Sequence, residues 1–386
     1  MVWAVNIVGG SVAGLALAKN LAENGWPVRV IEEHDKIGLP LQCSGLVSDS
    51  GVKRSGLDIE GLKINSVRGA EIHSPSGLKI KVAKRDPVAY VVDRAGLDQK
   101  LAKKAKAKGA EILTGAKVIS LKGENLFIKH ASGKGEMMKG KYLVGADGPN
   151  SFVRKELAYK QPKESRNFVA IHGRIEGSFD PEFVQLHFGP FAPKFFAWVI
   201  PNSKTEAKIG LATPIGTNLN DSLKQFMQAR LELKPSDVTN LGGGMIPIGP
   251  PLPELVKGNS LLLGDSAFMT KATTGGGILN SHHAASFAAR VIEKNHAGQS
   301  NSLKEYESLC KRELYPDLNL HWKIMKHFQS KSYSEIDSLF EKAHKSGLGE
   351  FLSEHGDMDR PTLFWDKLKG VKFWRLMPEL LKIGLS

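Results

Sequence analysis

The sequence predicts an α/β fold with a Rossmann-like dinucleotide-binding domain, an inserted antiparallel-sheet domain and a helical C-terminal region. Three observations predict it. The segment NIVGGSVAG, from Asn6, has the order of strand, glycine turn and helix that is typical of a dinucleotide site. The middle of the chain carries short strand-like runs separated by Gly, Pro and Asn. Residues 301–386 favour helices, with tryptophans and phenylalanines among lysines.

The N-terminal segment predicts a βαβ unit that ends in an acid. An apolar run long enough for one buried parallel strand precedes three glycines, and an Ala- and Leu-rich stretch with helical spacing follows. The elements are the strand Val5–Val8, the glycines Gly9, Gly10 and Gly14, the helix Ala13–Ala22, the strand Val28–Ile31 and the acid Glu32. Glycines let the backbone approach a pyrophosphate, and the helix N-terminus offers amide donors. Glu32 lies 18 residues after Gly14, where an acid can accept hydrogen bonds from an adenosine ribose.

A second glycine-rich segment lies far along the chain. LLLGDSAFMTKATTGGGI, from Leu261, ends in Gly275, Gly276 and Gly277 directly before a helical stretch. Together the two segments predict a flavoprotein, in which the second segment closes over the other end of the dinucleotide. Ser11 stands where the middle glycine of GxGxxG is expected, and we expect the turn to accept it because serine is small. The alternative is an ordinary glycine-rich turn.

Composition limits the class of protein and of partner. The chain has 386 residues, 41% hydrophobic and 24% charged, which suits a soluble protein of two or three domains. Its net charge of +13 favours anionic partners, but the lysines are scattered, so we do not expect nucleic acid. Two cysteines, Cys43 and Cys310, make no disulfide framework, and no run approaches the ~20 apolar residues of a spanning helix. We expect a cytoplasmic protein that can lie peripherally at the inner face of a membrane.

Two further segments extend the nucleotide-binding domain. Asp93–Gly109 predicts a helix with one apolar face and a solvated lysine face. Arg94 stands at its start, where it either reaches a phosphate or is a plain surface arginine. Tyr142–Gly145 predicts a short strand that runs into the turn ADGPNS.

The nucleotide motifs are split along the chain, which predicts insertions into one domain. We expect a discontinuous FAD-binding domain of residues 1–60, 90–165 and 255–300. A substrate-binding sheet domain would comprise residues 61–89 and 166–254, followed by the helical region 301–386. The predicted strands of the sheet domain are Val67–His73, Leu78–Val82, Phe168–Ile175, Phe195–Ile200 and Lys208–Ala212.

Four segments resemble the successive FAD motifs of glutathione-reductase-type flavoproteins with a hydroxylase-like fold: VNIVGGSVAGLALA, VVDRAGLD, LVGADGPNSFVR and LLLGDSAFMTKATTGGGI. That group includes aromatic monooxygenases, halogenases and geranylgeranyl reductases. GLPLQCSGLVS resembles the P-x-x-C-x-G motif of the geranylgeranyl reductases, and FFAWVIPNSKTEAKIGLA resembles their Y-x-W-x-F-P strand. The resemblance covers roughly residues 1–290. The helical region that follows is similar only in being helical and rich in aromatic residues.

The resemblance implies which residues bind FAD. It assigns the ADP half to Gly9, Ser11, Gly14 and Glu32, with Arg94 and Val118 along the adenosine and pyrophosphate. It assigns the flavin to Cys43, Ser44 and Gly45, the ribityl or pyrophosphate region to Asp265, and the ring to the amides of Gly277 and Ile278. One departure is Ala272, which stands where the wider group has proline.

On the substrate side the resemblance implies Phe196, Trp198 and Pro201, although Phe196 and Ile200 replace the tyrosine and phenylalanine of the reductase strand. The implied reaction is hydrogenation of isolated double bonds in geranylgeranyl chains, on a prenyl lipid or prenyl diphosphate. It requires a long apolar tunnel. The candidates for its lining, which could equally be packed sheet core, are Phe188, Phe191, Phe195, Phe196 and Trp198.

Cys43 is the candidate catalytic residue. Reduced flavin would give hydride to one alkene carbon and an acid would protonate the other, and Cys43 could be that acid. The alternative is a small buried hydrophobe, the usual role of a free cysteine. No second complete dinucleotide motif occurs, so the electron donor is either transiently bound NAD(P)H or a carrier protein.

The remaining motifs indicate no metal site and leave a membrane role open. His282 and His283 are adjacent on a predicted helix and point about 100° apart, so they make no metal pair. The stretch Phe364–Ile383 has apolar residues at helical spacing among lysines. It either lies on an anionic membrane or docks on the core, and Pro378 would bend or end it.

Two other functions stay open from the sequence. An FAD-dependent monooxygenase acting on an apolar or aromatic compound would share the same flavin motifs. A basic lipid- or nucleic-acid-binding protein with a vestigial flavin site would purify without bound yellow cofactor.

Overall fold

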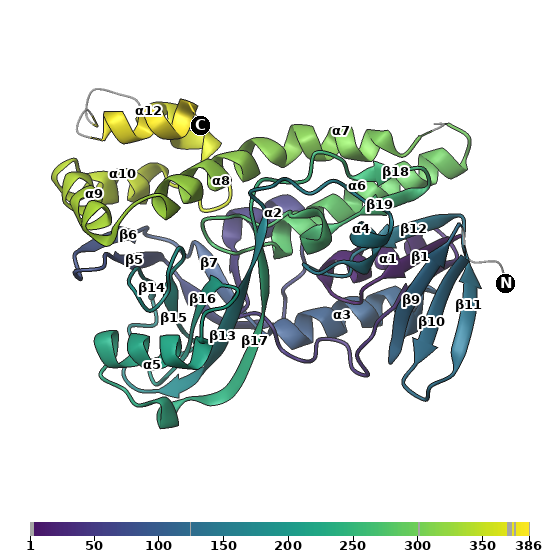
Figure 1. Ribbon diagram of the computed structural model, residues 1–386, viewed down its shortest axis with the longest axis horizontal. Coiled ribbons are helices and arrows are strands. Elements are labelled where there is room, and N and C mark those ends of the chain that lie inside the picture. The colour runs from purple at the N-terminus through teal and green to yellow at the C-terminus, as the bar shows by residue number, and fades with distance from the viewer. Residues whose placement is uncertain (1–3, 124, 300–301, 369–372, 374–375, 386) are drawn as a thin grey trace.

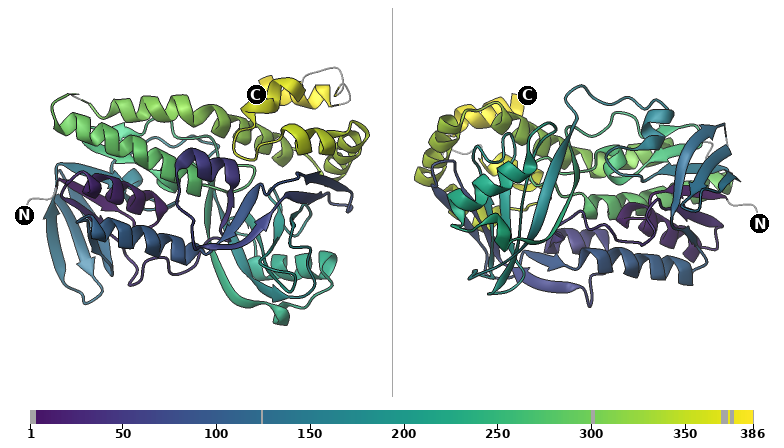
Figure 2. Two further views of the ribbon diagram at one scale, coloured as in Figure 1. Left: turned by 180° about the vertical axis from the view of Figure 1, so that it is seen from behind. Right: turned by 60° about the horizontal axis from the view of Figure 1, so that its bottom comes forward.

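The computed structural model describes residues 4–123, 125–299, 302–368, 373 and 376–385 (Figure 1). A six-stranded sheet forms one end of the molecule and a seven-stranded sheet the other. The C-terminal helices run along one side and cover both (Figures 1 and 2). The expected mixture of a nucleotide-binding sheet, an antiparallel sheet and C-terminal helices is confirmed.

The six-stranded sheet is built around the predicted βαβ unit. Its order is β18-β19-β12-β1-β2-β8. The strands are β1 (Val5–Val8), β2 (Val28–Ile31), β8 (Glu111–Leu113), β12 (Tyr142–Gly145), β18 (Val256–Lys257) and β19 (Ser260–Leu262). The predictions for β1, β2 and β12 are confirmed residue for residue. β1 pairs in parallel with β2 on one side and β12 on the other, so the strand order reverses there. Ligands bind at such a switch point, outside the carboxyl ends of the strands.

Three long helices pack together beside this sheet. α1 (Val12–Glu23) contacts both α3 (Arg94–Ala107) and α6 (Ile278–His296). α1 contains many small residues, which let it pack closely on its neighbours. Nine of its twelve residues are buried. The helix predicted from Asp93 is confirmed as α3. The Asp93 side chain accepts a hydrogen bond from the Gly96 amide and so caps the start of the helix.

The seven-stranded sheet has the order β17-β13-β16-β15-β14-β5-β6, and only the β14–β5 pair is parallel. Its strands are β5 (Gly69–His73), β6 (Lys79–Ala83), β13 (Arg166–Glu176), β14 (Phe183–His187), β15 (Ala197–Pro201), β16 (Glu206–Pro214) and β17 (Thr239–Ile248). Helix α5 (Leu219–Arg230) packs against β13 and β16. The predictions for β6, β13, β15 and β16 are confirmed within a few residues.

The single strand predicted over Val67–His73 is wrong. The chain forms β4 (Lys63–Val67) and then β5, which belong to different sheets. Val67 pairs with Ala89 of β7 (Ala89–Val92), in a three-stranded sheet with β3 (Leu46–Ser48). Gly69 pairs with Phe183 instead. A Cβ on Gly69 would lie 2.0 Å from the Val82 carbonyl oxygen, so glycine permits the change of sheet. The domain boundaries themselves stay a prediction.

The smaller elements complete the nucleotide-binding side. A three-stranded antiparallel sheet contains β9 (Ala116–Lys122), β10 (Asn125–His130) and β11 (Gly135–Lys139). Short helices are α2 (Asp49–Ser55) and α4 (Phe152–Glu156), with a single turn of 3₁₀ helix at Gly264–Ala267. A second such turn, Pro235–Asp237, contacts α5 beside the seven-stranded sheet.

The C-terminal region is helical, as expected. It contains α7 (Lys304–Glu313), α8 (Tyr315–Gln329), α9 (Tyr333–Lys345), α10 (Leu348–His355), α11 (Thr362–Leu368) and α12 (Met377–Leu385). The stretch predicted as one helix over Phe364–Ile383 is divided between α11 and α12, and Pro378 lies in the first turn of α12. Lys369, Val371, Lys372, Trp374 and Arg375 lie outside the described residues. Within those residues no helix combines the length and apolar character needed to cross a bilayer.

Candidate active site

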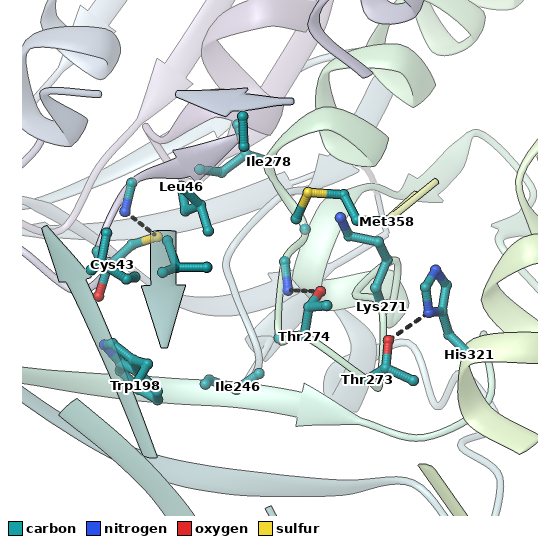
Figure 3. A pocket seen from close by; sticks show the side chains of 18 of the residues that line it. Cys43, Leu46, Trp198, Ile246, Lys271, Thr273, Thr274, Ile278, His321 and Met358 are labelled. Carbon is teal, nitrogen blue, oxygen red and sulfur yellow. Dashed lines mark hydrogen bonds between the residues drawn. The ribbon is translucent and has the colours of Figure 1, made fainter. Parts of the chain in front are cut away.

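One large cavity joins the two sheets and the C-terminal helices. Its volume is about 2140 Å³. A pocket for one small ligand measures about 300–1,000 Å³, so this cavity has room for a cofactor and a further ligand. Figure 3 shows Cys43, Leu46 and Trp198 on one side of it and Lys271, Thr273 and His321 on the other.

Close contacts around the turn after β1 require two glycines, one in the turn and one in the first turn of α1. Gly9 has φ +107°, and a Cβ there would lie 2.1 Å from the Ala146 carbonyl oxygen in the turn after β12. A Cβ on Gly14 would lie 2.1 Å from the Gly9 carbonyl oxygen. Gly9 lines the cavity and Gly14 does not, so Gly14 serves close packing of α1 on the turn. Its contact with the ADP half stays a prediction.

The start of α1 is arranged for an anion. Ser11 precedes the helix but its side chain makes no capping hydrogen bond, which leaves the first amides of α1 available. The Ser11 hydroxyl instead accepts a hydrogen bond from Arg94 Nη2 at 2.7 Å. Arg94 Nη1 also lies 2.8 Å from Asp98 Oδ2.

Arg94 is therefore not a plain surface arginine. Its side chain is 11% exposed and lines the cavity beside Ser11. This position suits a phosphate contact, which stays a prediction. Sequence reasoning missed Asp98, although its spacing of four residues from Arg94 on one helix was a usable signal.

Glu32 follows β2 directly and lies at the edge of the cavity. Its carboxylate accepts hydrogen bonds from the Gly10 amide at 2.6 Å and from the His34 amide at 3.0 Å. Val118 of β9 is buried and lines the cavity nearby. The structure thus brings Glu32 and Val118 to the same end of the cavity as the glycine turn, and their cofactor contacts stay predictions.

The Cys43–Gly45 turn lies between the two sheets. Cys43 Sγ accepts a hydrogen bond from the Gly45 amide at 3.4 Å, drawn in Figure 3. Gly45 has φ +77°, and a Cβ there would lie 2.5 Å from the Val92 carbonyl oxygen. The Ser44 carbonyl accepts a hydrogen bond from Lys208 Nζ at 2.7 Å. All three residues of the turn line the cavity.

Two of the three predicted substrate residues lie in the cavity lining and one does not. Phe196 and Trp198 line the cavity, whereas Pro201 does not: it ends β15, and its carbonyl accepts a hydrogen bond from Asn65. Trp198 Nε1 and Ser44 Oγ are buried and find no hydrogen-bond partner among the described residues. Both residues line the cavity, where these two polar atoms can contact a bound molecule.

The segment before α6 forms the opposite wall. Asp265 accepts a hydrogen bond from Thr270 Oγ1 at 3.1 Å, and burial raises the pKa of Asp265 against the effects of Thr270 and Arg94. A Cβ on Gly277 would lie 2.7 Å from Asp265 Oδ1. Gly277 precedes α6 without a side-chain cap, so the amides of that helix start also face the cavity uncapped.

Comparison with known proteins agrees with this geometry. Residues 3–228 match the family model described as an FAD binding domain. A protein of Methanocaldococcus jannaschii is 30% identical over 364 residues, 92% of each chain. Digeranylgeranylglycerophospholipid reductase 2 of Methanothermobacter thermautotrophicus is 26% identical, over 88% of this chain and 91% of that protein. A geranylgeranyl bacteriochlorophyll reductase-like structure from Thermoplasma acidophilum has a TM-score of 0.85 at 22% identity, over 99% of both chains.

The chain belongs to the geranylgeranyl reductase family of FAD-dependent oxidoreductases. Its cofactor is FAD. More distant structures share the fold alone, for example a flavin-dependent brominase with a TM-score of 0.70 at 16% identity.

The residues present fit FAD. Glycine is required at three places where the backbone or an acid approaches closely, namely Gly9, Gly14 and Gly277. Two uncapped helix starts, those of α1 and α6, face the cavity and offer amide donors. Such donors suit a pyrophosphate at one end and negative charge on a reduced flavin at the other.

A buried polar network, which sequence reasoning missed, holds the loop before α6. Lys271 Nζ pairs with the Asp359 carboxylate, which also accepts a hydrogen bond from Ser48 Oγ. His321 Nδ1 lies 2.6 Å from Thr273 Oγ1, and its Nε2 lies 3.3 Å from the Asp359 carbonyl oxygen. Lys271 and Asp359 are 88 positions apart, so no local pattern could have indicated the pair.

The C-terminal helices line an apolar part of the cavity, which we call the apolar arm. Beyond Trp198 the cavity is lined by Phe188 and Phe196 from the sheet side, and by Phe328, Leu339, Phe340 and Phe364 from α8, α9 and α11. Phe188 stacks on Phe328 with ring centroids 5.7 Å apart. Of the other tunnel candidates, Phe191 and Phe195 do not line the cavity. Phe191 packs against Phe226 on the far face of the sheet.

His282 and His283 lie outside the cavity lining. His282 Nδ1 lies 2.9 Å from the Ser55 carbonyl oxygen, and burial lowers the pKa of His282 to about 4. His283 packs on Phe287. In the described part of the chain no three His, Cys, Asp or Glu side chains gather as metal ligands. Cys310 is buried in α7, and burial raises the pKa of its thiol to about 12, which suits a structural role.

Proposed function

We propose that this protein is an FAD-dependent reductase that hydrogenates isolated C=C bonds of geranylgeranyl chains on membrane lipid precursors. The observation that carries the proposal is the continuity of the flavin site with an apolar arm under the C-terminal helices. The aliphatic and aromatic side chains of these walls suit a long hydrocarbon chain, although polar residues such as His327 and Glu379 also line the cavity. The relatives named digeranylgeranylglycerophospholipid reductase support this substrate class.

The FAD, when reduced, supplies a hydride to one alkene carbon. The residues of the chain hold the alkene and provide the proton. Trp198 and Leu46 keep the chain beside Cys43, and the apolar walls exclude water (Figure 3). The Cys43 S–H bond breaks as a C–H bond forms at the second carbon, and the thiolate then regains a proton from solvent. NAD(P)H or a carrier protein replenishes the two electrons.

The test is direct reduction of a lipid by the purified protein. FAD-loaded protein is reduced with dithionite, which removes the question of the natural donor, and is given a glycerophospholipid with two geranylgeranyl chains. Mass spectrometry should find two hydrogens gained per reduced bond, and none gained with a saturated lipid. Unchanged lipid mass with stoichiometric reduced FAD would overturn the proposal. Oxygen incorporation into the lipid, coupled to NAD(P)H oxidation, would instead indicate the alternative, an FAD-dependent monooxygenase.

We also propose that the last two helices contact the membrane that holds the lipid. Leu363 and Leu381 are 56% and 53% exposed beside the exposed Lys367 and Lys382. Neighbours on the same helices, such as Phe364, are buried and line the apolar arm. A surface of this kind suits an anionic bilayer, and a chain could pass from it into the cavity.

Vesicle flotation tests this contact. The double variant L363S/L381S should bind anionic vesicles several-fold more weakly than the unchanged protein. M137S is the matched control, because Met137 is 60% exposed at the opposite end of the molecule, on β11 (Figure 1). Equal flotation of all three proteins would reject the membrane contact.

A further inference from the structure

A buried lysine stands behind the Cys43–Gly45 turn. Lys208 lies on β16, in the middle of the seven-stranded sheet, and is 5% exposed. On the neighbouring strands it is opposite Ile200 and Arg174. In the part of the chain that the structure describes, no carboxylate forms an ion pair with it, and Asp93 and Glu206 act only as more distant charges. Its ammonium donates a hydrogen bond to the Ser44 carbonyl oxygen, at 2.7 Å.

Burial of this ammonium is costly. Removing a charge from water costs several kcal/mol unless a counter-charge compensates it, and one carbonyl oxygen compensates only part. An apolar residue would pack in the middle of a sheet without that cost. A buried and incompletely paired cation beside a cavity therefore indicates a functional role.

The Ser44 carbonyl that Lys208 binds directly follows Cys43 in the chain, so the ammonium lies beside the turn that carries the thiol. Burial lowers the pKa of Lys208, and Cys43 is the largest influence that raises it again. The positive charge of Arg174 also lowers the pKa of Lys208, whereas the negative charges of Asp93 and Glu206 raise it. His172, on the adjacent strand β13, is buried. Burial lowers the pKa of His172, and the positive charge of Lys208 lowers it further.

We propose that Lys208 is a positioning residue for proton transfer from Cys43. Its ammonium holds the turn through the Ser44 carbonyl, and its charge balances the thiolate that remains when Cys43 gives up its proton. This inference rests on the proposed function. When the S–H bond breaks, the electron pair stays on sulfur, the proton goes to the alkene carbon, and the hydride comes from reduced FAD. A fixed positive charge near the sulfur favours the thiolate without reorganisation at the moment of transfer.

The test uses the reactivity of Cys43, which needs no substrate. Iodoacetamide alkylates thiolates, and peptide mass spectrometry separates Cys43 from the buried Cys310, which serves as an internal control. The rate is measured against pH on FAD-bound protein and again after FAD removal. The variants are K208M, which removes charge and donor, K208Q, which keeps a donor without charge, and K208R, which keeps both. K204M is the matched control, because Lys204 is exposed in the turn between β15 and β16.

We expect K208M and K208Q to alkylate Cys43 about tenfold more slowly at neutral pH, the factor for a charge interaction worth one pH unit. Their rate profiles should move to higher pH, while K208R and K204M follow the unchanged protein. Lipid reduction should fall in the same order with KM unchanged.

Two outcomes would overturn the inference. Equal alkylation in K208Q and the unchanged protein would leave Lys208 as an anchor alone, and K208R as slow as K208M would exclude a role for its charge. If K208M fails to fold, the K208Q and K208R pair decides. If alkylation shifts as expected but no lipid is reduced, the coupling of Lys208 to Cys43 stands and the proposed function fails.

Discussion

Lys271→Met should destabilise the protein through Asp359. The two side chains are 8% and 2% exposed, and their ion pair joins the loop before α6 to the segment between α10 and α11. Methionine keeps the length of the lysine stem but leaves a buried carboxylate without its counter-charge. Breaking a buried pair in this way costs about 3–5 kcal/mol. At about 2 °C per kcal/mol for a long chain, the melting temperature should fall by roughly 6–10 °C.

The pH dependence of this variant follows from Asp359. Burial tends to raise the pKa of Asp359, and Lys271 outweighs it, so the pKa is lowered in the folded protein. A lowered folded-state pKa gives stability that is present above the unfolded-state pKa of about 3.9 and is lost as pH falls through the folded-state value. Lys271→Met removes that contribution. The difference between variant and unchanged protein should therefore shrink as pH falls and Asp359 takes up a proton.

The assay is thermal release of FAD, followed by flavin fluorescence together with circular dichroism. The double variant K271M/D359N removes both charges and keeps an acceptor for Ser48, so it should recover most of the loss. K53M is the control, since Lys53 also pairs with an aspartate, Asp49, but is 76% exposed and should show no measurable change. Equal losses in the single and double variants, or a single variant that melts like K53M, would refute the reasoning.

Three further predictions concern the site and the pH profile. Cys43→Ala should keep FAD bound and slow lipid reduction by about 10²–10⁴-fold, the contribution of a general acid, and an unchanged rate would remove Cys43 from the mechanism. Gly14→Ala places a Cβ 2.1 Å from the Gly9 carbonyl oxygen, so FAD titration should detect weaker binding, with about 1–3 kcal/mol of strain. Wild-type affinity would contradict that contact. Burial lowers the pKa of His321 to about 3, so stability should fall as pH drops below about 6.5, because the unfolded histidine takes the proton. His321→Gln should flatten this part of a urea-unfolding profile, and an unchanged slope would assign it to other groups.

The sequence alone determined the nucleotide-binding unit. The strands β1, β2 and β12 lie where their apolar runs predict, and α1 begins directly after the glycine turn. These elements depend on residues close together in the chain: apolar runs fix buried strands, and glycine fixes a turn that no side chain could enter. The family followed from the same local motifs.

The sequence could not place Pro201 or divide the β4–β5 segment. Pro201 belongs to a motif whose other members face the cavity, but its own position is set by where β15 ends. The change of sheet at Arg68 depends on strands β7 and β14, which are distant in sequence. Register and sheet membership follow from long-range pairing, which a local alternation of residues does not encode.

Only the tertiary structure decided which polar groups meet. It joined Lys271 to Asp359 and Lys208 to Ser44 across 88 and 164 positions, and it made the C-terminal helices a wall of the cavity. A lysine in the sequence is most simply a solvated side chain, and its partners become visible only when packing removes it from water. The physical reason is that burial, which makes a charge costly and therefore informative, is a property of the folded chain.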